Sequence, residues 1–341
     1  MSHKHWLQIG VLGSLLAICL PTAWGQVNSY NTSASGDWET AGSWSLGVAP
    51  GTTQTAIFLT NATTKTVTIS STTPSGNLTI SNLTVSAPSG SANTLFINGN
   101  SLEIIRSFTN LARGTVTVTN GGFHVKNGTV IEGQVEIQQS ASMTSTGLFQ
   151  ISKTSGASGT LTISGGDARI NGSGTEMVVG RSGTGRLLMS AGTLVIQNGS
   201  SLIVGRSSGD GFGVGTISVS GGVTTNSVTT TVGQHHGNLI LSGGEWVQQA
   251  DITLGVAGGG AAGQGTLSVL GGTYRQTAGA ISLGVATSGG AHLGRLIVGG
   301  GQLYFGAYTG GTSFANAGDY WYGTGTGEGK IRVKIVPVED E

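Results

Sequence analysis

The sequence predicts an all-β protein, a right-handed parallel β-helix (a β-solenoid) with about 22 to 30 residues in each coil. Three observations predict this class. Glycine supplies 62 of the 341 residues, and charged residues supply only 9%. A glycine-bounded motif recurs along the chain, and apolar residues alternate with threonine and serine inside it. An antiparallel β-sandwich is the structural alternative, because glycine-rich corners also suit hairpin turns.

Two interleaved motifs carry the repeat. The first reads GTLTISGG from Gly159 and returns at a mean interval of 27 residues up to Gly294. Its other copies begin at Gly114, Gly185, Gly215, Gly237 and Gly265. The copies of the second, shorter motif end at Gly180, Gly205, Gly233, Gly255 and Gly284. Two independent motifs that keep one order and a similar period indicate a repeat architecture.

Alternation with a period of two residues assigns the strands. In the copy at Gly159, Leu161 and Ile163 are apolar and alternate with Thr160, Thr162 and Ser164, which is typical of a strand with one buried face. A third short strand is expected after each glycine pair. It places four residues at one equivalent position: Leu194, Trp246, Tyr274 and Leu303. Stacked coils bury each apolar pair against the next, with backbone hydrogen bonds between coils about 4.8 Å apart.

This order of elements divides the chain into four parts. Residues 1–25 are the expected signal peptide, and residues 26–60 are the expected N-terminal cap with the first strands. Residues 61–303 are the expected solenoid, and residues 304–341 are the expected C-terminal cap and tail.

Aromatic residues indicate the two caps. Trp38 and Trp44 lie before the first regular strand, and residues 304–321 are also rich in aromatic side chains. The ends of a solenoid expose unpaired strands that must be covered, so we expect both clusters to act as caps. Platforms that stack on glycans are the alternative interpretation of both clusters.

The segment that opens the chain has the pattern of a secretory signal peptide. A short polar stretch containing Lys4 precedes an apolar run from Leu7 to Leu20, and Ala23 and Gly25 fit the small residues before a cleavage site. The only cysteine of the chain lies within this segment, so the mature chain is expected to contain no disulfide. We therefore expect a secreted, extracellular or cell-surface protein without a transmembrane segment in its mature chain.

The charge of the chain argues against one class of partner. It carries 15 basic and 15 acidic residues, for a formal net charge of zero. A nucleic-acid binder carried by a basic face needs an excess of lysine and arginine. No nucleic-acid partner is therefore expected.

Several segments resemble a known group of proteins. The opening SGDWETAGSWSLGVAPGTTQTAIF, the following GNLTISNLTV and the repeated G-x-L-x-V-S-G-G and L-x-V-G resemble secreted bacterial proteins with autotransporter-associated β-strand repeats. The resemblance covers roughly residues 38–303. It implies an extracellular, passenger-like β-helix, similar to surface proteins that carry a PEP-type sorting signal. The chain lacks the outer-membrane barrel, and its end IRVKIVPVEDE lacks the sorting signal, so neither self-translocation nor covalent sorting is expected.

The acidic residues argue against catalysis. Many parallel β-helices cleave polysaccharides. Glycoside hydrolysis needs two carboxylates about 5 to 9.5 Å apart, and a lyase needs acids that bind Ca²⁺ beside a base. The repeat places Asp167 and Glu245 at one position and Glu176 and Asp251 at another, and each pair is three coils apart. We therefore expect no catalytic residues, although pairs between different columns stay open.

Arg181 and Arg206 are the candidate ligand-binding residues. Both follow a V-G corner on consecutive coils, and stacked like charges are unfavourable unless something compensates them. In the structural interpretation, Asp210 compensates the charge of the two arginines, or their side chains are simply exposed to solvent. In the functional interpretation, the two arginines bind a sulfate or a uronate. His235 and His236 are adjacent, so on a strand they would point to opposite faces. Neither a metal site nor a cofactor is expected.

The sequence thus predicts a secreted or surface-exposed structural or adhesion β-solenoid without catalytic activity. The expected partner is an extracellular polysaccharide or the cell-surface matrix. The alternative is a polysaccharide-binding or polysaccharide-active β-helix protein, similar to a lyase or a hydrolase.

Overall fold

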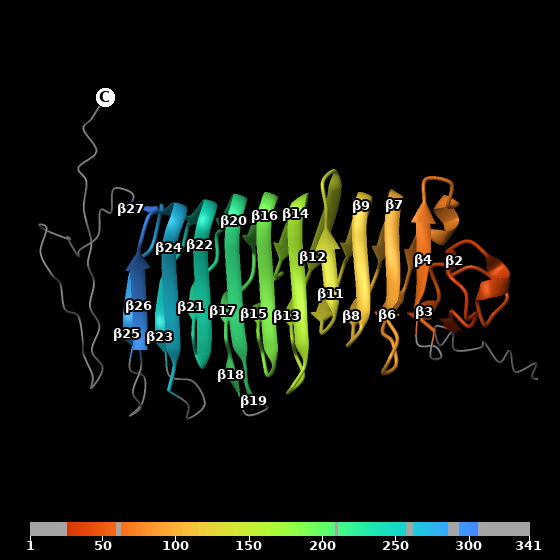
Figure 1. Ribbon diagram of the computed structural model, residues 1–341, viewed down its shortest axis with the longest axis horizontal. Helices are drawn as coiled ribbons and strands as arrows, with labels where there is room; N and C mark the ends of the chain where they lie inside the picture. The colour runs from red at the N-terminus through yellow and green to blue at the C-terminus, as the bar shows by residue number, and fades with distance from the viewer. Residues whose placement is uncertain (1–25, 59–62, 209–210, 257–261, 286–292, 306–341) are drawn as a thin grey trace, which may run out of the picture.

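The computed structural model describes residues 26–58, 63–208, 211–256, 262–285 and 293–305. Their strands stack into an elongated parallel β-solenoid of about ten coils (Figure 1). The predicted parallel β-helix is confirmed. The antiparallel sandwich is wrong, because neighbouring strands in both large sheets run parallel. The expected signal peptide and nearly all of the expected C-terminal cap lie outside the described residues.

Short strands form a sheet of 11 members. In spatial order they are β1 (Val27–Ser29), β3 (Thr55–Phe58), β6 (Asn82–Val85), β8 (Ser107–Asn110), β10 (Gly128–Ile131), β13 (Leu148–Ile151), β15 (Glu176–Val179), β17 (Ser201–Val204), β21 (Thr230–Val232), β23 (Ile252–Val256) and β25 (Ile281–Val285).

Most of the strands in the second sheet, which has 14 members, are longer. They are β2 (Gly36–Asp37), β4 (Lys65–Ser70), β7 (Asn93–Ile104), β9 (Gly114–Val125), β11 (Gln134–Ile137), β14 (Ser158–Asn171), β16 (Thr184–Gln197), β20 (Val214–Asn226), β22 (His236–Gln248), β24 (Gln264–Gln276) and β26 (Leu293–Val298), with β5 (Thr79–Ile80), β12 (Ala141–Thr146) and β27 (Gln302–Phe305) beside them. Outside the two sheets lie the hairpin β18 (Ser207–Ser208) and β19 (Gly211–Phe212) and the 3-10 helices η1 (Ala41–Ser43) and η2 (Ser75–Asn77).

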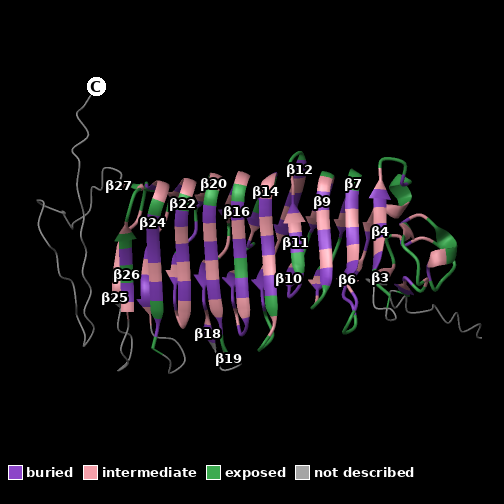
Figure 2. Cartoon of the chain, in the orientation of Figure 1, coloured by how far each residue is buried: buried purple, intermediate pink, exposed green. Residues whose placement is uncertain are grey.

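The side chains that were predicted to point inward form the core, and equivalent side chains of successive coils stack in columns along the axis. Leu161 of β14 pairs with Leu187 of β16, and the same column continues coil by coil through Ile217, Leu239 and Leu267. All five side chains are buried. Figure 2 shows buried residues alternating with more exposed ones along the strands, as period-two patterning requires. Burial of aliphatic side chains from coil to coil is therefore continuous along the axis.

Gly-Gly steps, or Ala-Gly in the case of β16, bend most of the long strands. Gly192 in β16 has a φ of +85°, in the left-handed region that favours glycine. A Cβ there would also collide with the backbone of Gly166 on the preceding coil. The segment after the bend continues the same strand, and it stacks Leu194 in one column with Trp246, as predicted. The predicted third strand is therefore the second half of each long strand.

Coil length varies along the stack. The copies of the first motif from Gly159 onward are paired in register at the expected spacing. Two earlier coils are shorter, because Leu95 pairs with Val116 and Val116 pairs in turn with Val135. These two coils thus keep the strand register although their turns contain fewer residues.

An aromatic cluster lies at the N-terminal end of the described residues. Tyr30, Trp38 and Trp44 are buried, and Trp44 makes edge-to-face contacts with both of the other rings. The indole N–H of Trp38 donates to the carbonyl of Asn77, 2.8 Å away, and that of Trp44 donates to the carbonyl of Trp38. Buried rings offer no face to a sugar, so the glycan-platform alternative fails for this cluster.

A ladder of buried amides runs inside the C-terminal coils. Ile170 and Ile196 occupy one inward column, and Asn226, Gln248 and Gln276 continue it. The side-chain N–H groups of Gln248 donate to the carbonyl oxygens of Val228 and Ala250 at 3.1 and 3.0 Å. Turn carbonyls that would otherwise be orphaned inside the core are thereby satisfied.

Two aromatic residues complete this amide ladder. Trp246 donates its indole N–H to the Gln248 Oε1 atom at 3.1 Å, and the Tyr274 hydroxyl donates to the Gln276 Oε1 atom at 2.7 Å. Burial raises the pKa of Tyr274 far above its ordinary value, so its hydroxyl stays protonated as a donor. The amide ladder and its aromatic neighbours therefore act as one polar network within an apolar core.

The inward register is tested by Leu239→Ala on a middle coil. The side chain is fully buried, so its truncation should lower the free energy of unfolding by about 2 to 5 kcal/mol. The neighbouring outward change Asn238→Ala should stay within about 0.5 kcal/mol. Urea-induced unfolding measures both values, and equal losses would show that the register is wrong.

The amide ladder is tested by Gln248→Leu. The change removes the acceptor of the Asn226 and Trp246 N–H groups and the donor to two carbonyls. Each buried group left unpaired costs about 1 to 3 kcal/mol, so the unfolding midpoint in urea should fall clearly. Ile196→Leu, in the same column, should cost less than about 1.5 kcal/mol. A Gln248→Leu protein as stable as this control would contradict a structural role for the ladder.

Candidate binding site at the glycine corners

The two candidate arginines lie at equivalent corners of consecutive coils. The short strands β15 and β17 pair in register up to Val179 and Val204, and each ends at a glycine with positive φ. The Arg181 amide donates to the carbonyl of Ser152, and the Arg206 amide donates to the carbonyl of Gly180. The backbone thus holds the two arginines on consecutive coils at one edge of the solenoid.

Arg206 has a carboxylate partner within the chain. Its Nη1 atom forms an ion pair with the Glu176 Oε2 atom, and both side chains are partly exposed to solvent. This pairing compensates part of the stacked positive charge. The sequence suggested Asp210 for that role, but Asp210 lies outside the described residues. A guanidinium has five N–H donors in a fixed fork, so one ion pair leaves donors for a second anion.

A short hairpin extends the corner beside Arg206. Strands β18 and β19 pair antiparallel, with Ser207 opposite Phe212, and the Gly213 amide donates back to the carbonyl of Arg206 at 2.8 Å. The hairpin also lies against the preceding coil, where a Cβ on Gly211 would be 3.3 Å from the Ser182 Cβ. It therefore links the coils that carry Arg181 and Arg206.

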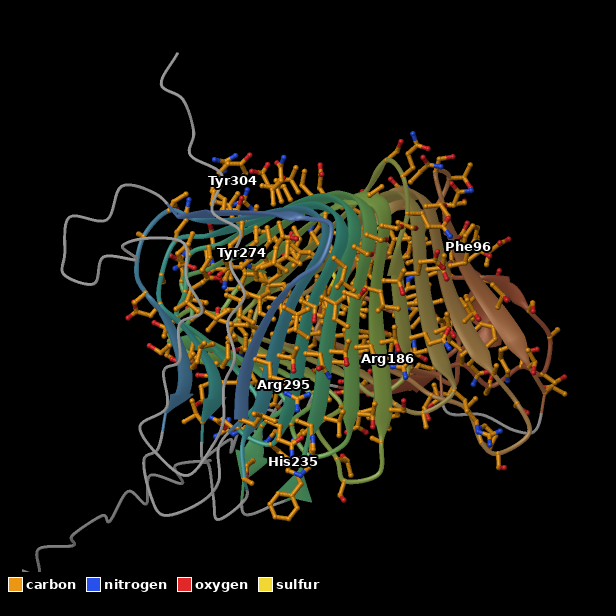
Figure 3. The ribbon with its side chains drawn as sticks, turned by 60° about the vertical axis from the view of Figure 1, so that its left-hand side comes forward. Phe96, Arg186, His235, Tyr274, Arg295 and Tyr304 are labelled. Carbon is orange, nitrogen blue, oxygen red and sulfur yellow. The ribbon has the colours of Figure 1, made fainter. Side chains whose placement is uncertain are left out.

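Phe212 presents an exposed ring at the end of this hairpin. Its side chain is 54% exposed, and its ring stacks on that of His235, with centroids 5.0 Å apart and planes 27° apart. His235 comes from the next coil and lies at the edge of the solenoid in Figure 3. We call Arg181, Arg206, Phe212 and His235 the corner site. The sequence indicated its arginines, but it did not indicate the exposed ring of Phe212 on the hairpin that follows Arg206.

The histidine pair lies at the boundary between a turn and a strand. His235 precedes β22 and His236 begins it, and their rings meet edge to face at 4.1 Å. Burial lowers the pKa of His235, an effect that the hydrogen bond to the Gly213 carbonyl partly opposes and the charge of His236 reinforces. The neutral form of His235 is therefore favoured. Within the described ranges, no three histidine, cysteine or acidic residues gather as metal ligands do.

The acidic columns have the predicted spacing. Asp167 pairs with Thr193, which pairs with Val223, which in turn pairs with Glu245. Two coils therefore intervene between the two carboxylates, about 14 Å along the axis. This distance exceeds the range that glycoside hydrolysis requires.

Other outward charges pair between adjacent coils. Glu103 contacts Lys126, and the Arg275 Nε atom lies 3.1 Å from the Glu245 Oε1 atom. The Arg275 guanidinium also lies 4.8 Å from the centroid of the Tyr304 ring. Such exposed pairs contribute little to stability but reduce repulsion along a stacked column.

Comparisons of the chain with protein-family models, with curated proteins and with solved structures gave no match. In the described part of the chain, no segment forms a helix long and apolar enough to cross a membrane.

Proposed function

We propose that this chain is a secreted, surface-exposed β-solenoid that acts as a structural or adhesion module without catalytic activity. In this proposal it contacts an acidic extracellular polysaccharide at the corner site. The observation that carries the proposal is that Arg206 directly precedes the hairpin whose second strand exposes the Phe212 ring, and that the Gly213 amide after this ring donates to the Arg206 carbonyl. A uronate offers a carboxylate for the guanidinium and an apolar C–H face for the ring.

The rest of the described surface supports a structural module. The outward column that begins with Thr66 continues through Thr94 and Thr115, so much of this face presents uncharged hydroxyls. The same column later carries Arg186 and Arg295, which Figure 3 shows on the face of the solenoid. Secretion rests on the signal-peptide pattern of residues 1–25, and the resemblance to autotransporter-associated repeats supports the same location.

The proposal predicts that Arg206→Ala weakens binding of polygalacturonate, a uronate polymer. The loss of a charge-assisted contact should raise the Kd roughly fivefold or more, equivalent to about 1 kcal/mol. Phe212→Ala should also weaken binding, because the stacking platform is lost. Glu176→Gln should strengthen binding, because Glu176 competes with the ligand for the same guanidinium. Isothermal titration at several salt concentrations measures these values, and affinity should fall as salt rises.

Arg295→Ala is the matched control, because Arg295 is an exposed arginine in a different column. Its Kd should equal that of the unchanged chain. Equal affinities of the Arg206→Ala and Arg295→Ala proteins would contradict the proposed site. New reducing ends or unsaturated products in the polymer would contradict the absence of catalysis and favour the polysaccharide-active alternative.

A further inference from the structure

A third basic residue, Lys153, lies on the coil before the one that carries Arg181. The short strands β13, β15 and β17 pair in register, and Lys153, Arg181 and Arg206 are each the second residue after one of them. Lys153 is exposed, and the two arginines are partly exposed. The three residues therefore place three positive charges on consecutive coils, and we call them the basic row.

The backbone holds the basic row at one equivalent corner. The residue before each member has a positive φ, which is +60° at Ser152, +75° at Gly180 and +73° at Gly205. The amide of each of these corner residues donates to the carbonyl of the last residue in the short strand of the preceding coil. The three side chains therefore leave the backbone at the same place on each coil. Because a serine replaces the corner glycine before Lys153, the V-G pattern did not indicate this residue.

Two carboxylates lie beside the basic row. Glu176 pairs with Arg206. Glu132, on the coil before Lys153, is buried, and its Oε1 atom accepts a hydrogen bond from the Thr154 amide at 2.7 Å. Glu132 thereby fixes the turn that presents Lys153. At this end of the row the exposed charge is that of the lysine.

The spacing of the row suits an anion that recurs on every sugar of a polymer. Neighbouring coils are about 4.8 Å apart, which is close to the length of one sugar unit in an extended polysaccharide chain. A polyuronate carries a carboxylate on every sugar, whereas hyaluronate carries one on every second sugar. A chain that runs parallel to the solenoid axis can therefore bring a carboxylate to each member of the row only if every sugar is charged.

We propose that the basic row binds three successive sugars of a polyuronate whose chain runs parallel to the solenoid axis. Each carboxylate meets one basic side chain in a charge-assisted contact, through the planar fork of an arginine or the point charge of the lysine. This inference rests on the proposed function. It adds the class of polymer, charged on every sugar, and a third binding residue, Lys153.

Galacturonate oligomers of two and three sugars test the length of the site by isothermal titration. The unchanged chain should bind the trimer more tightly than the dimer. Lys153→Ala should raise the Kd of the trimer roughly twofold to fivefold, because one exposed ion pair is lost. The trimer and the dimer should then bind this variant with similar affinity.

Arg186→Ala is the matched control. Arg186 is an exposed arginine on the same coil as Arg181, but it lies in the long strand β16 on the face of the solenoid (Figure 3). Its substitution removes the same charge and should leave both Kd values unchanged. A trimer Kd raised equally by Arg186→Ala and Lys153→Ala would overturn the inference, because the effect would then come from net charge alone.

Two further outcomes separate this inference from the proposed function. If Arg206→Ala raises the Kd of the trimer and Lys153→Ala does not, the three-sugar site is wrong and the proposed function stands. If neither substitution changes the Kd, both are contradicted. Hyaluronate oligomers should bind more weakly than galacturonate oligomers with the same number of carboxylates, and equal Kd values would overturn the proposed class of polymer.

Discussion

The ladder of parallel backbone hydrogen bonds between coils is the constraint on which the rest of this structure depends. Each coil can pair with the next only if both turn at the same places, because the strands are about 4.8 Å apart along the axis. Glycine makes this possible. At Gly205, for example, φ is +73° and a Cβ would collide with the carbonyl of His236 on the next coil. The high glycine content thus follows from close stacking at the corners.

Inside the coils this constraint limits which residue types can occupy each inward position. A residue on an inward column touches its equivalents on both neighbouring coils, so volume and polarity must match along the column. Aliphatic residues satisfy this requirement in the column of Leu161 and Leu187. Amides satisfy it in the column of Gln248 and Gln276, where each also binds the carbonyls of its own turn. The polar segment of the core is therefore as regular as the apolar one.

Sequence alone predicted the features that repeat. Leu239 and Leu241 could be assigned to the core because the same alternation recurs in every coil, and the corner glycines because they recur with it. The amide ladder was missed because Asn, Gln and the earlier isoleucines share no chemical pattern, so only the register places them in one column. The Glu176–Arg206 pair and the stack of Phe212 on His235 were missed for another reason. They depend on how turns of unequal length fold at one corner. The repeat period of the sequence does not predict the conformation of such turns.

Outside the coils the same architecture permits variation. Turns between a corner glycine and the next long strand differ in length, and one of them is long enough to form the β18–β19 hairpin. That hairpin brings an exposed ring to a corner where arginines already follow the glycines. One extended turn can therefore expose a new aromatic side chain without any change to the stack that supports it.

The claim that corner glycines set the stacking of the coils is tested most directly by Gly233→Ala. Gly233 has a φ of +81°, and a Cβ there would collide with the backbone of Gln264 and Gly265. Urea-induced unfolding should show a loss of about 2 kcal/mol or more. Gly76→Ala should cost no more than about 0.5 kcal/mol, because a Cβ on Gly76 meets no atom within 4 Å. Equal stability of the two variant proteins would contradict the account.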